Sequence, residues 1–248
     1  MSETHPPAEL EPAADASAEL RAPLTVLVCL VPVAVAGELL RWQGYGIGQQ
    51  QLLADPILAH LGGLIGLTLP VLPLIALIVG ALLAQVFGGW PWKPPAARTL
   101  ALALAWSLAW IAARVALAGA WHRFGPDQLA GPAGLALCGA FQEELIFRAL
   151  LLGGLVLLLR TLHVPGILAA FVGLAVGAPL FSLAHTVLIN HFPGAEPFAW
   201  PVFIERTAAG VLYGIAFLRH GLAVATAAHA GFNALRVFAP QEWLDFAG

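Results

Sequence analysis

Charged residues are scarce in this chain of 248 residues. Asp, Glu, Lys and Arg make up 10% of it, and 60% of the residues are hydrophobic. A typical soluble domain carries about 25% charged residues, so the scarcity excludes an ordinary soluble domain and indicates a polytopic protein of the lipid bilayer. The Ala-, Leu- and Gly-rich composition favours a prokaryotic cell membrane as its location.

Cysteines and basic clusters are also few. The two cysteines, Cys29 and Cys138, each lie in an apolar run and outside any C-x-x-C or other metal-binding spacing. This predicts that both pack in the interior. The sequence has no basic cluster and no ladder of aromatic residues, which excludes nucleic acid as a partner.

The N-terminus lacks the basic region that opens a secretory signal peptide. Residues 1–22 are rich in Ala, Pro and acidic side chains and show no apolar periodicity, which predicts a disordered acidic tail. The apolar run that begins at Leu24 is therefore expected to be a retained first membrane helix. A multi-pass membrane domain over 23–240 and a short tail over 241–248 complete the predicted organisation.

Seven apolar runs are long enough to be membrane helices, which predicts an all-α polytopic membrane protein with a bundle of about seven transmembrane helices. The second run contains Pro70 and Pro73, so we expect a kinked helix, or a span joined to an interfacial piece. Loop Lys and Arg residues favour a cytoplasmic N-terminus. The runs are Leu24–Leu40, Ile57–Phe87, Thr99–Ala120, Ala133–Leu159, Gly166–Ile189, Val202–Leu218 and Leu222–Ala239.

Three ionisable side chains, Glu143, Glu144 and Arg148, interrupt the fourth run. Each ionised group at the bilayer centre costs roughly 2.5–3.5 kcal/mol, so their presence requires a reason. The spacing of four residues puts Glu144 and Arg148 on one helix face, where they can pair, whereas Glu143 points about 100° away. A structural ion pair is one interpretation of Glu144 and Arg148. Glu143 is expected to carry function, because intramembrane carboxylates usually do.

Two later apolar runs, the fifth and the seventh, each carry a histidine within the run. His185 follows Phe181 by four residues, and Pro179 is expected to bend the helix just before the histidine. His229 and Asn233 are one helical turn apart on the last run, and both can donate hydrogen bonds to a developing oxyanion. Hydrogen bonding between helices is the structural alternative for this pair.

Other polar residues of the runs receive structural interpretations. Arg114 is expected to snorkel or to pair, and Glu205 and Arg206 are expected to lie at the membrane interface. Gly210-x-x-x-Gly214 predicts a face on which two helices approach closely.

Three motifs follow one another on late apolar runs: Glu143-Glu144-x-x-x-Arg148, Phe181-x-x-x-His185 and His229-x-x-x-Asn233. In this order they resemble the CPBP family, which comprises the CAAX proteases and bacteriocin-processing enzymes, also called Abi proteins, and includes the Ras-converting CAAX endopeptidase. The motif core spans about residues 133–239. The resemblance implies that 23–240 is an intramembrane protease domain on a bundle of about eight helices.

The resemblance also implies roles for the motif residues. Glu143 would be the base that activates water, with His185 as its partner. His229 and Asn233 would stabilise the oxyanion, and Glu144, Arg148 and Phe181 would shape the site. The list of catalytic and site-shaping candidates is therefore Glu143, His185, His229, Asn233, Glu144, Arg148 and Phe181.

A zinc ion is an alternative to a metal-free site. Glu143, His185 and His229 would form a two-histidine, one-carboxylate set of the kind that binds catalytic zinc. The sequence has no H-E-x-x-H motif, and no two of these residues share a helix turn. A mechanism without a cofactor is favoured because it also gives Asn233 a role.

The expected substrate is a membrane-associated peptide or protein, such as a leader- or tail-bearing peptide cut near its end. A transporter or proton relay also needs intramembrane Glu, His and Arg, but such proteins often show inverted repeats, which this sequence lacks. A non-catalytic immunity or scaffold protein is a third interpretation. The complete set of polar motif residues argues against it.

Overall fold

The computed structural model describes residues 14–42, 72–120, 133–189 and 195–238. These residues form helices joined by turns and loops, with one isolated β-bridge and no β-strand among them, so the predicted all-helical class is confirmed for this part of the chain. The helices are α1 (Ala14–Arg21), α2 (Pro23–Trp42), α4 (Leu72–Phe87), α5 (Ala97–Ala120), α6 (Ala133–Glu144), the π-helix η2 (Leu145–Gly153), α7 (Gly154–Thr161), α8 (Gly166–Leu183), α9 (Trp200–His220) and α10 (Leu222–Phe238).

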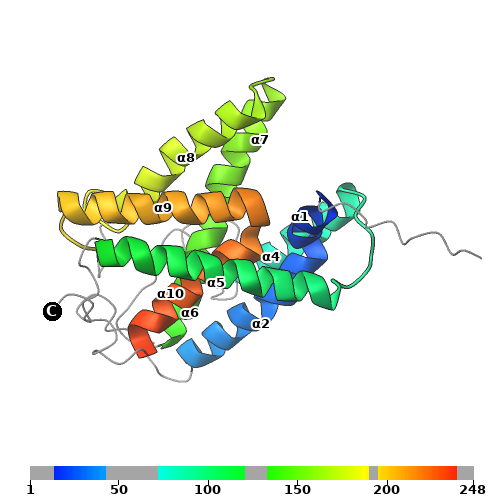
Figure 1. The fold of residues 1–248 in the computed structure, drawn as a ribbon, viewed down its shortest axis with the longest axis horizontal. Helices are drawn as coiled ribbons and strands as arrows, with labels where there is room; N and C mark the ends of the chain where they lie inside the picture. Colours follow the sequence, from blue (N-terminus) through cyan, green and yellow to red (C-terminus); the bar gives the residue numbers. More distant parts are fainter. Residues whose placement is uncertain (1–13, 43–71, 121–132, 190–194, 239–248) are drawn as a thin grey trace, which may run out of the picture.

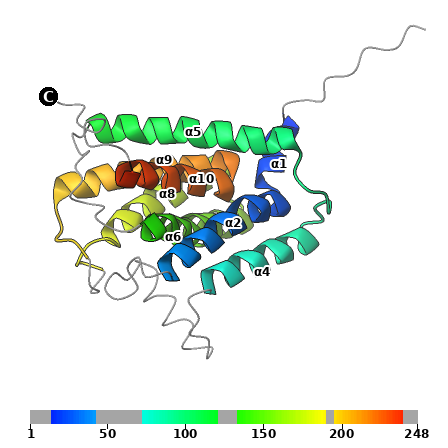
Figure 2. The same ribbon diagram turned by 90° about the horizontal axis from the view of Figure 1, so that it is seen from below.

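The helix α10 occupies the centre of the bundle, where it packs against α5, α6 and α9. In Figure 2, α5 lies along one side of the molecule, α4 lies along the other, and α9 and α10 lie between them. Figure 1 shows α7 and α8 projecting together as a hairpin from the rest of the bundle. Helix α2 packs against both α4 and α6 and thereby connects α4 to the rest of the bundle.

One continuous helical rod carries the acidic motif. Helix α6 ends at Glu144, η2 follows without a break, and α7 continues the rod to Thr161. A π-helical stretch is rare and often lies at a functional site. The predicted fourth run is thus one helix with a widened middle, and the two glutamates precede the point where it widens.

Small residues bring the helices into close contact around the centre. A Cβ atom added to Gly210 would lie 3.1 Å from the Cα of Ala178, and one added to Gly214 would lie 2.4 Å from Leu174. The predicted glycine face therefore packs α9 against α8. Gly221 has a φ of 87°, a backbone conformation that favours glycine, and it turns the chain from α9 directly into α10.

The predicted number of spans is not confirmed. By length and composition, three helices in the described ranges can cross a membrane: Ala97–Gly119, Gly166–Leu183 and Trp200–His220. Helices within Pro23–Gly37 and Pro73–Phe87 are apolar but shorter, and the rod through α6, η2 and α7 carries the charged motif. Residues 57–71 of the second predicted run and the predicted tail over 241–248 lie outside the described residues.

One prediction at the N-terminal side needs correction. The predicted disordered tail does not extend over residues 14–21, which form α1, and the Leu20 side chain of that helix is only 1% exposed, packed against Ala103 and Val224. Pro73 is the second residue of α4, where the missing N–H is tolerated. The kink or interfacial piece predicted for the second run stays a prediction, because the part of the run before α4 lies outside the described residues.

The two cysteines lie in the interior to different degrees. Cys138 is buried on α6, where its sulfur lies 2.8 Å from a Cβ atom added to Gly37. Cys29 on α2 is partly buried and packs against the core cluster that includes Phe141. The predicted packing role is confirmed for Cys138.

Candidate active site

The helical rod presents its two adjacent carboxylates in different environments. Glu144 is fully buried, with 0% exposure, and Arg148 is 2% exposed. A nitrogen of Arg148 lies 3.2 Å from Oε1 of Glu144, so the pairing predicted from the spacing of four residues is confirmed. The Glu143 side chain keeps 14% of its surface exposed. Of the two carboxylates, Glu143 is therefore the one that an incoming molecule can reach.

Arg148 is held by two other helices. One of its terminal nitrogens donates a hydrogen bond to the carbonyl of Gly210 on α9, at 3.4 Å. Its guanidinium carbon lies 4.3 Å from the ring centre of Phe181 on α8, at the distance of a cation–π interaction. Glu144 and Arg148 thus join the rod to α8 and α9 through a buried charged pair.

His185 lies just beyond the end of α8, because the helix ends at Leu183 and not at the end of the predicted run. Its Nδ1 is 2.8 Å from the carbonyl oxygen of Phe181, one turn earlier. A carbonyl oxygen can only accept, so Nδ1 carries the proton, and in the neutral ring Nε2 carries a lone pair. That Nε2 lies 3.6 Å from Oε1 of Glu143. The spacing Phe181-x-x-x-His185 therefore fixes the orientation of the imidazole.

Glu144 orients His229 in the same way. The Nδ1 of His229 donates a hydrogen bond to Oε1 of Glu144, at 2.9 Å, and its Nε2 lies 3.8 Å from Oε2 of Glu143. The ring of Tyr213 stacks on the imidazole, with the centroids 4.5 Å apart and the planes 16° apart. A buried carboxylate and an aromatic face together hold the ring in one position.

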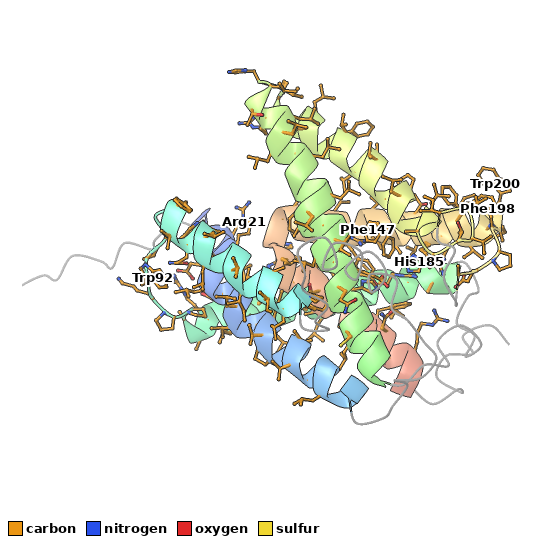
Figure 3. The ribbon with its side chains drawn as sticks, turned by 180° about the vertical axis from the view of Figure 1, so that it is seen from behind. Arg21, Trp92, Phe147, His185, Phe198 and Trp200 are labelled. Atoms are coloured by element: carbon orange, nitrogen blue, oxygen red, sulfur yellow. The ribbon has the colours of Figure 1, made fainter. Side chains whose placement is uncertain are left out.

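The two imidazoles meet at the carboxylate of Glu143. Each Nε2 faces a different oxygen of this group, and both distances are too long for a direct hydrogen bond. Asn233 lies half-buried on α10, one turn beyond His229. Helix α6, the turn after α8 and helix α10 thus bring Glu143, His185 and His229 together, with aromatic rings from Phe181 and Tyr213 beside the imidazoles. Figure 3 shows His185 lying toward the middle of the bundle.

Sequence reasoning missed Tyr213, and it gave pairing as one interpretation of Arg114 without identifying the partner. Tyr213 carries no motif, although it follows Gly210 by three residues on the same face of α9. Arg114 on α5 forms an ion pair with Glu205 on α9, and each is 7% exposed. The predicted pairing of Arg114 is thus confirmed, and the interfacial position predicted for Glu205 stays a prediction.

Within the described ranges, no group of three or more His, Cys, Asp or Glu side chains is arranged to hold a metal ion. The chemistry of the donors is compatible with zinc, which binds imidazole nitrogens and carboxylates. The two Nδ1 hydrogen bonds to a carbonyl and a carboxylate are also of the kind that orients zinc-binding histidines.

Residues 125–235 match the family model described as Rce1-like, the type II CAAX prenyl endopeptidase Rce1-like domain. The matched segment contains all the candidate catalytic and site-shaping residues, from Glu143 to Asn233. The resemblance seen in the three motifs is thereby confirmed. Comparison with curated proteins and with solved structures finds no match.

Proposed function

We propose, from the match of residues 125–235 to the Rce1-like family model of type II CAAX prenyl endopeptidases, that the chain hydrolyses a peptide bond of a membrane-associated substrate by water activation. One observation carries the proposal. The Nε2 atoms of His185 and His229 face the two oxygens of Glu143, at 3.6 and 3.8 Å. Their Nδ1 atoms donate hydrogen bonds to the carbonyl of Phe181 and to the carboxylate of Glu144.

The first step is proton transfer from water to Glu143. A water molecule beside Glu143 and His185 donates one hydrogen bond to the carboxylate and the other to the lone pair on Nε2. As the water oxygen forms a bond to the carbonyl carbon of the substrate, its proton passes to Glu143, which acts as the general base. The fixed Nδ1 proton of His185 supports this role, because it leaves Nε2 free to accept.

The second requirement is stabilisation of the oxyanion. The amide of Asn233 donates a hydrogen bond to the carbonyl oxygen as it gains negative charge. His229 donates a second one from Nε2 when its ring is protonated at both nitrogens. The carboxylate of Glu144 stabilises that imidazolium, as an aspartate does in serine proteases. Arg148 pairs with Glu144 and balances its charge in the interior.

Collapse of the tetrahedral intermediate completes the reaction. The C–N bond breaks as Glu143 returns its proton to the leaving nitrogen, so the products are a carboxylic acid and an amine, and proton transfer from the acid to the amine then gives a carboxylate and an ammonium group. The step needs no oxidant and no cofactor. If zinc is present, Glu143, His185 and His229 would hold it, and the ion would then supply Lewis-acid activation of water.

The substrate we propose is a leader- or tail-bearing peptide cut near its end at the membrane. The two buried charged residues of the motif and the apolar helices around them support a substrate that is delivered within or along the bilayer. The test is cleavage of a set of membrane-inserted peptides in vesicles containing the purified protein, in water enriched in ¹⁸O. New termini with one ¹⁸O atom in each new carboxylate support hydrolysis, whereas uptake of intact peptide or of protons without cleavage would favour a transporter.

A further inference from the structure

The chain after α8 is held by a short backbone pairing. Beyond Leu183, Thr186 forms a parallel bridge with Glu196, which precedes α9. The N–H of Glu196 donates to the carbonyl of His185, and the N–H of Val187 donates to the carbonyl of Glu196, both at 2.9 Å. Because His185 lies beyond the end of its helix, this bridge and one turn of the chain hold its backbone in place.

The side chain of Glu196 is held in turn by α9. One terminal nitrogen of Arg206 donates hydrogen bonds to both carboxylate oxygens of Glu196, at 3.0 and 3.1 Å. Pro197 follows Glu196 and favours the extended backbone that the bridge requires. Arg206 belongs to the second turn of α9 and Glu196 lies just before that helix, so the ion pair joins the bridge to the start of α9.

A second hydrogen bond joins the same elements. The hydroxyl of Ser182, in the last turn of α8, donates to the carbonyl of Phe203 on α9, at 3.0 Å. The start of α9 therefore contacts the chain on both sides of His185: through Ser182 before it and through Glu196 after it. In Figure 3, His185 lies inward of Phe198 and Trp200, which mark this start of α9.

We infer that Glu196 and Arg206 are positioning residues for His185. Their ion pair holds Glu196 in the backbone bridge, and the bridge holds the carbonyl group of His185. The Nε2 of His185 is thereby kept facing Glu143. The inference rests on the proposed function, since it gives the pair a role in that reaction. A displacement of about 1 Å in a catalytic group can lower the rate by about a hundredfold, so a residue outside the reacting atoms can matter.

The ion pair is suited to a test by substitution. The Glu196 side chain is 37% exposed and that of Arg206 is 16% exposed. Partly exposed pairs contribute little to overall stability, so variants should fold. The variants are Glu196→Gln, Arg206→Gln and the charge reversal Glu196→Arg with Arg206→Glu. The matched control is Arg98→Gln, which removes an ion pair with Glu19 between α1 and α5.

Two measurements are made on each variant in the same vesicles. Amide hydrogen exchange at Val187 and Glu196 reports whether the bridge is intact, and initial rates at varied peptide concentration give kcat and KM. For the single variants we expect exchange to accelerate, kcat to fall by about ten- to a hundredfold and KM to change by less than about threefold. The charge reversal should recover most of both losses, and the control should resemble the wild type.

Two results would overturn the inference: accelerated exchange with an unchanged kcat, or a lowered kcat with unchanged exchange. A failure of the proposed function gives a different result, because the wild-type protein would then cleave no peptide at all. Exchange would in that case still report whether the ion pair holds the bridge, and the catalytic part of the inference would be rejected.

Discussion

At His229, a single hydrogen bond determines what the imidazole can do. Its Nδ1 proton is committed to Glu144, so a neutral ring can only accept at Nε2. Donation to an oxyanion from Nε2 therefore requires a second proton on the ring. The same carboxylate pairs with Arg148. The buried glutamate of the motif thus contacts both Arg148 and His229, for which we propose a catalytic role.

Replacement of Asn233 tests the proposed oxyanion site. Asn233→Ala should lower kcat by roughly a hundred- to a thousandfold, as the loss of one oxyanion donor does in other enzymes. KM should change much less, because the charge that the amide meets exists only in the transition state. Asn233→Asp removes the donor and adds a negative charge, so it should be at least as damaging. Steady-state kinetics of both variants check this, and a change confined to KM would remove Asn233 from that role.

The helical rod through α6, η2 and α7 shows how an element prepares the site. A π-helix has more residues per turn than an α-helix, and here the consecutive residues Phe147 and Arg148 are both buried. Phe147 packs edge to face on Phe181, whereas Arg148 lies over the face of the same ring. The widened turn therefore lets the rod direct two neighbouring side chains at α8.

The ion pair between Arg114 and Glu205 is expected to stabilise the packing of α5 on α9. Glu205→Gln should lower the free energy of unfolding by about 3–5 kcal/mol, because it leaves the buried charge of Arg114 without its partner. The double variant Arg114→Met with Glu205→Leu should recover most of the lost free energy of unfolding, since apolar residues can replace a buried ion pair. Thermal unfolding in detergent measures both, and an unchanged midpoint for the single variant would contradict the expectation.

The sequence predicted contacts within one helix better than contacts between helices. The pairing of Glu144 with Arg148 follows from helix geometry alone, whereas His185 lies in the turn after α8, where its Nδ1 contacts the carbonyl of Phe181. The hydrogen bond from His229 to Glu144 joins residues 85 positions apart, and it depends on how α10 rotates against the rod. Stacking of Tyr213 on His229 has the same origin, because spacing along one helix does not determine which face meets a neighbour.

The predicted number of membrane spans stays a prediction, and the helix ends were predicted less well than the contacts within one helix. Apolar composition marks a segment as compatible with lipid, but it does not fix where the helix begins or ends. The fifth predicted run extends to Ile189, whereas α8 ends at Leu183 and leaves His185 in a turn. The first run was expected to follow a disordered tail, whereas α1 buries Leu20 directly before it.

Across the whole molecule, α1 joins the ends of several helices. The hydroxyl of Ser17 donates to the carbonyl of Arg219 at the end of α9, and Glu19 accepts a hydrogen bond from Thr99 and pairs with Arg98 at the start of α5. Figure 2 shows α1 beside the start of α5. The short helix is therefore expected to stabilise the packing of the end of α9 against the start of α5.

The attachment of α1 should depend on pH. The Thr99 hydroxyl, aided by the charge of Arg98, holds the pKa of Glu19 below its usual value, against the opposite effect of partial burial. A carboxyl with a lowered pKa contributes stability above its unfolded pKa of about 4.3, and this contribution is lost as the pH falls through the folded pKa. Amide exchange of residues 14–21, corrected for its intrinsic pH dependence, should thus accelerate on acidification below about pH 4. The variant Glu19→Gln should show no such step.

Metal removal tests the chemistry of the whole enzyme. The metal-free mechanism predicts that the purified protein keeps its activity after prolonged treatment with a strong chelator and contains no stoichiometric zinc. Activity assays and elemental analysis on the same sample provide the measurement. Inactivation by chelator that added zinc reverses would make Glu143, His185 and His229 metal ligands.

The most direct test of the account compares Glu143→Gln with Glu144→Gln. Both substitutions keep the shape of the side chain, but the first removes the proposed base and the second removes the buried partner of Arg148 and His229. We measure peptide cleavage in vesicles together with the thermal unfolding midpoint. Glu143→Gln should lower kcat by about a hundred- to ten-thousandfold and leave the midpoint unchanged, whereas Glu144→Gln should lower both. Full cleavage by the folded Glu143→Gln variant would contradict the account.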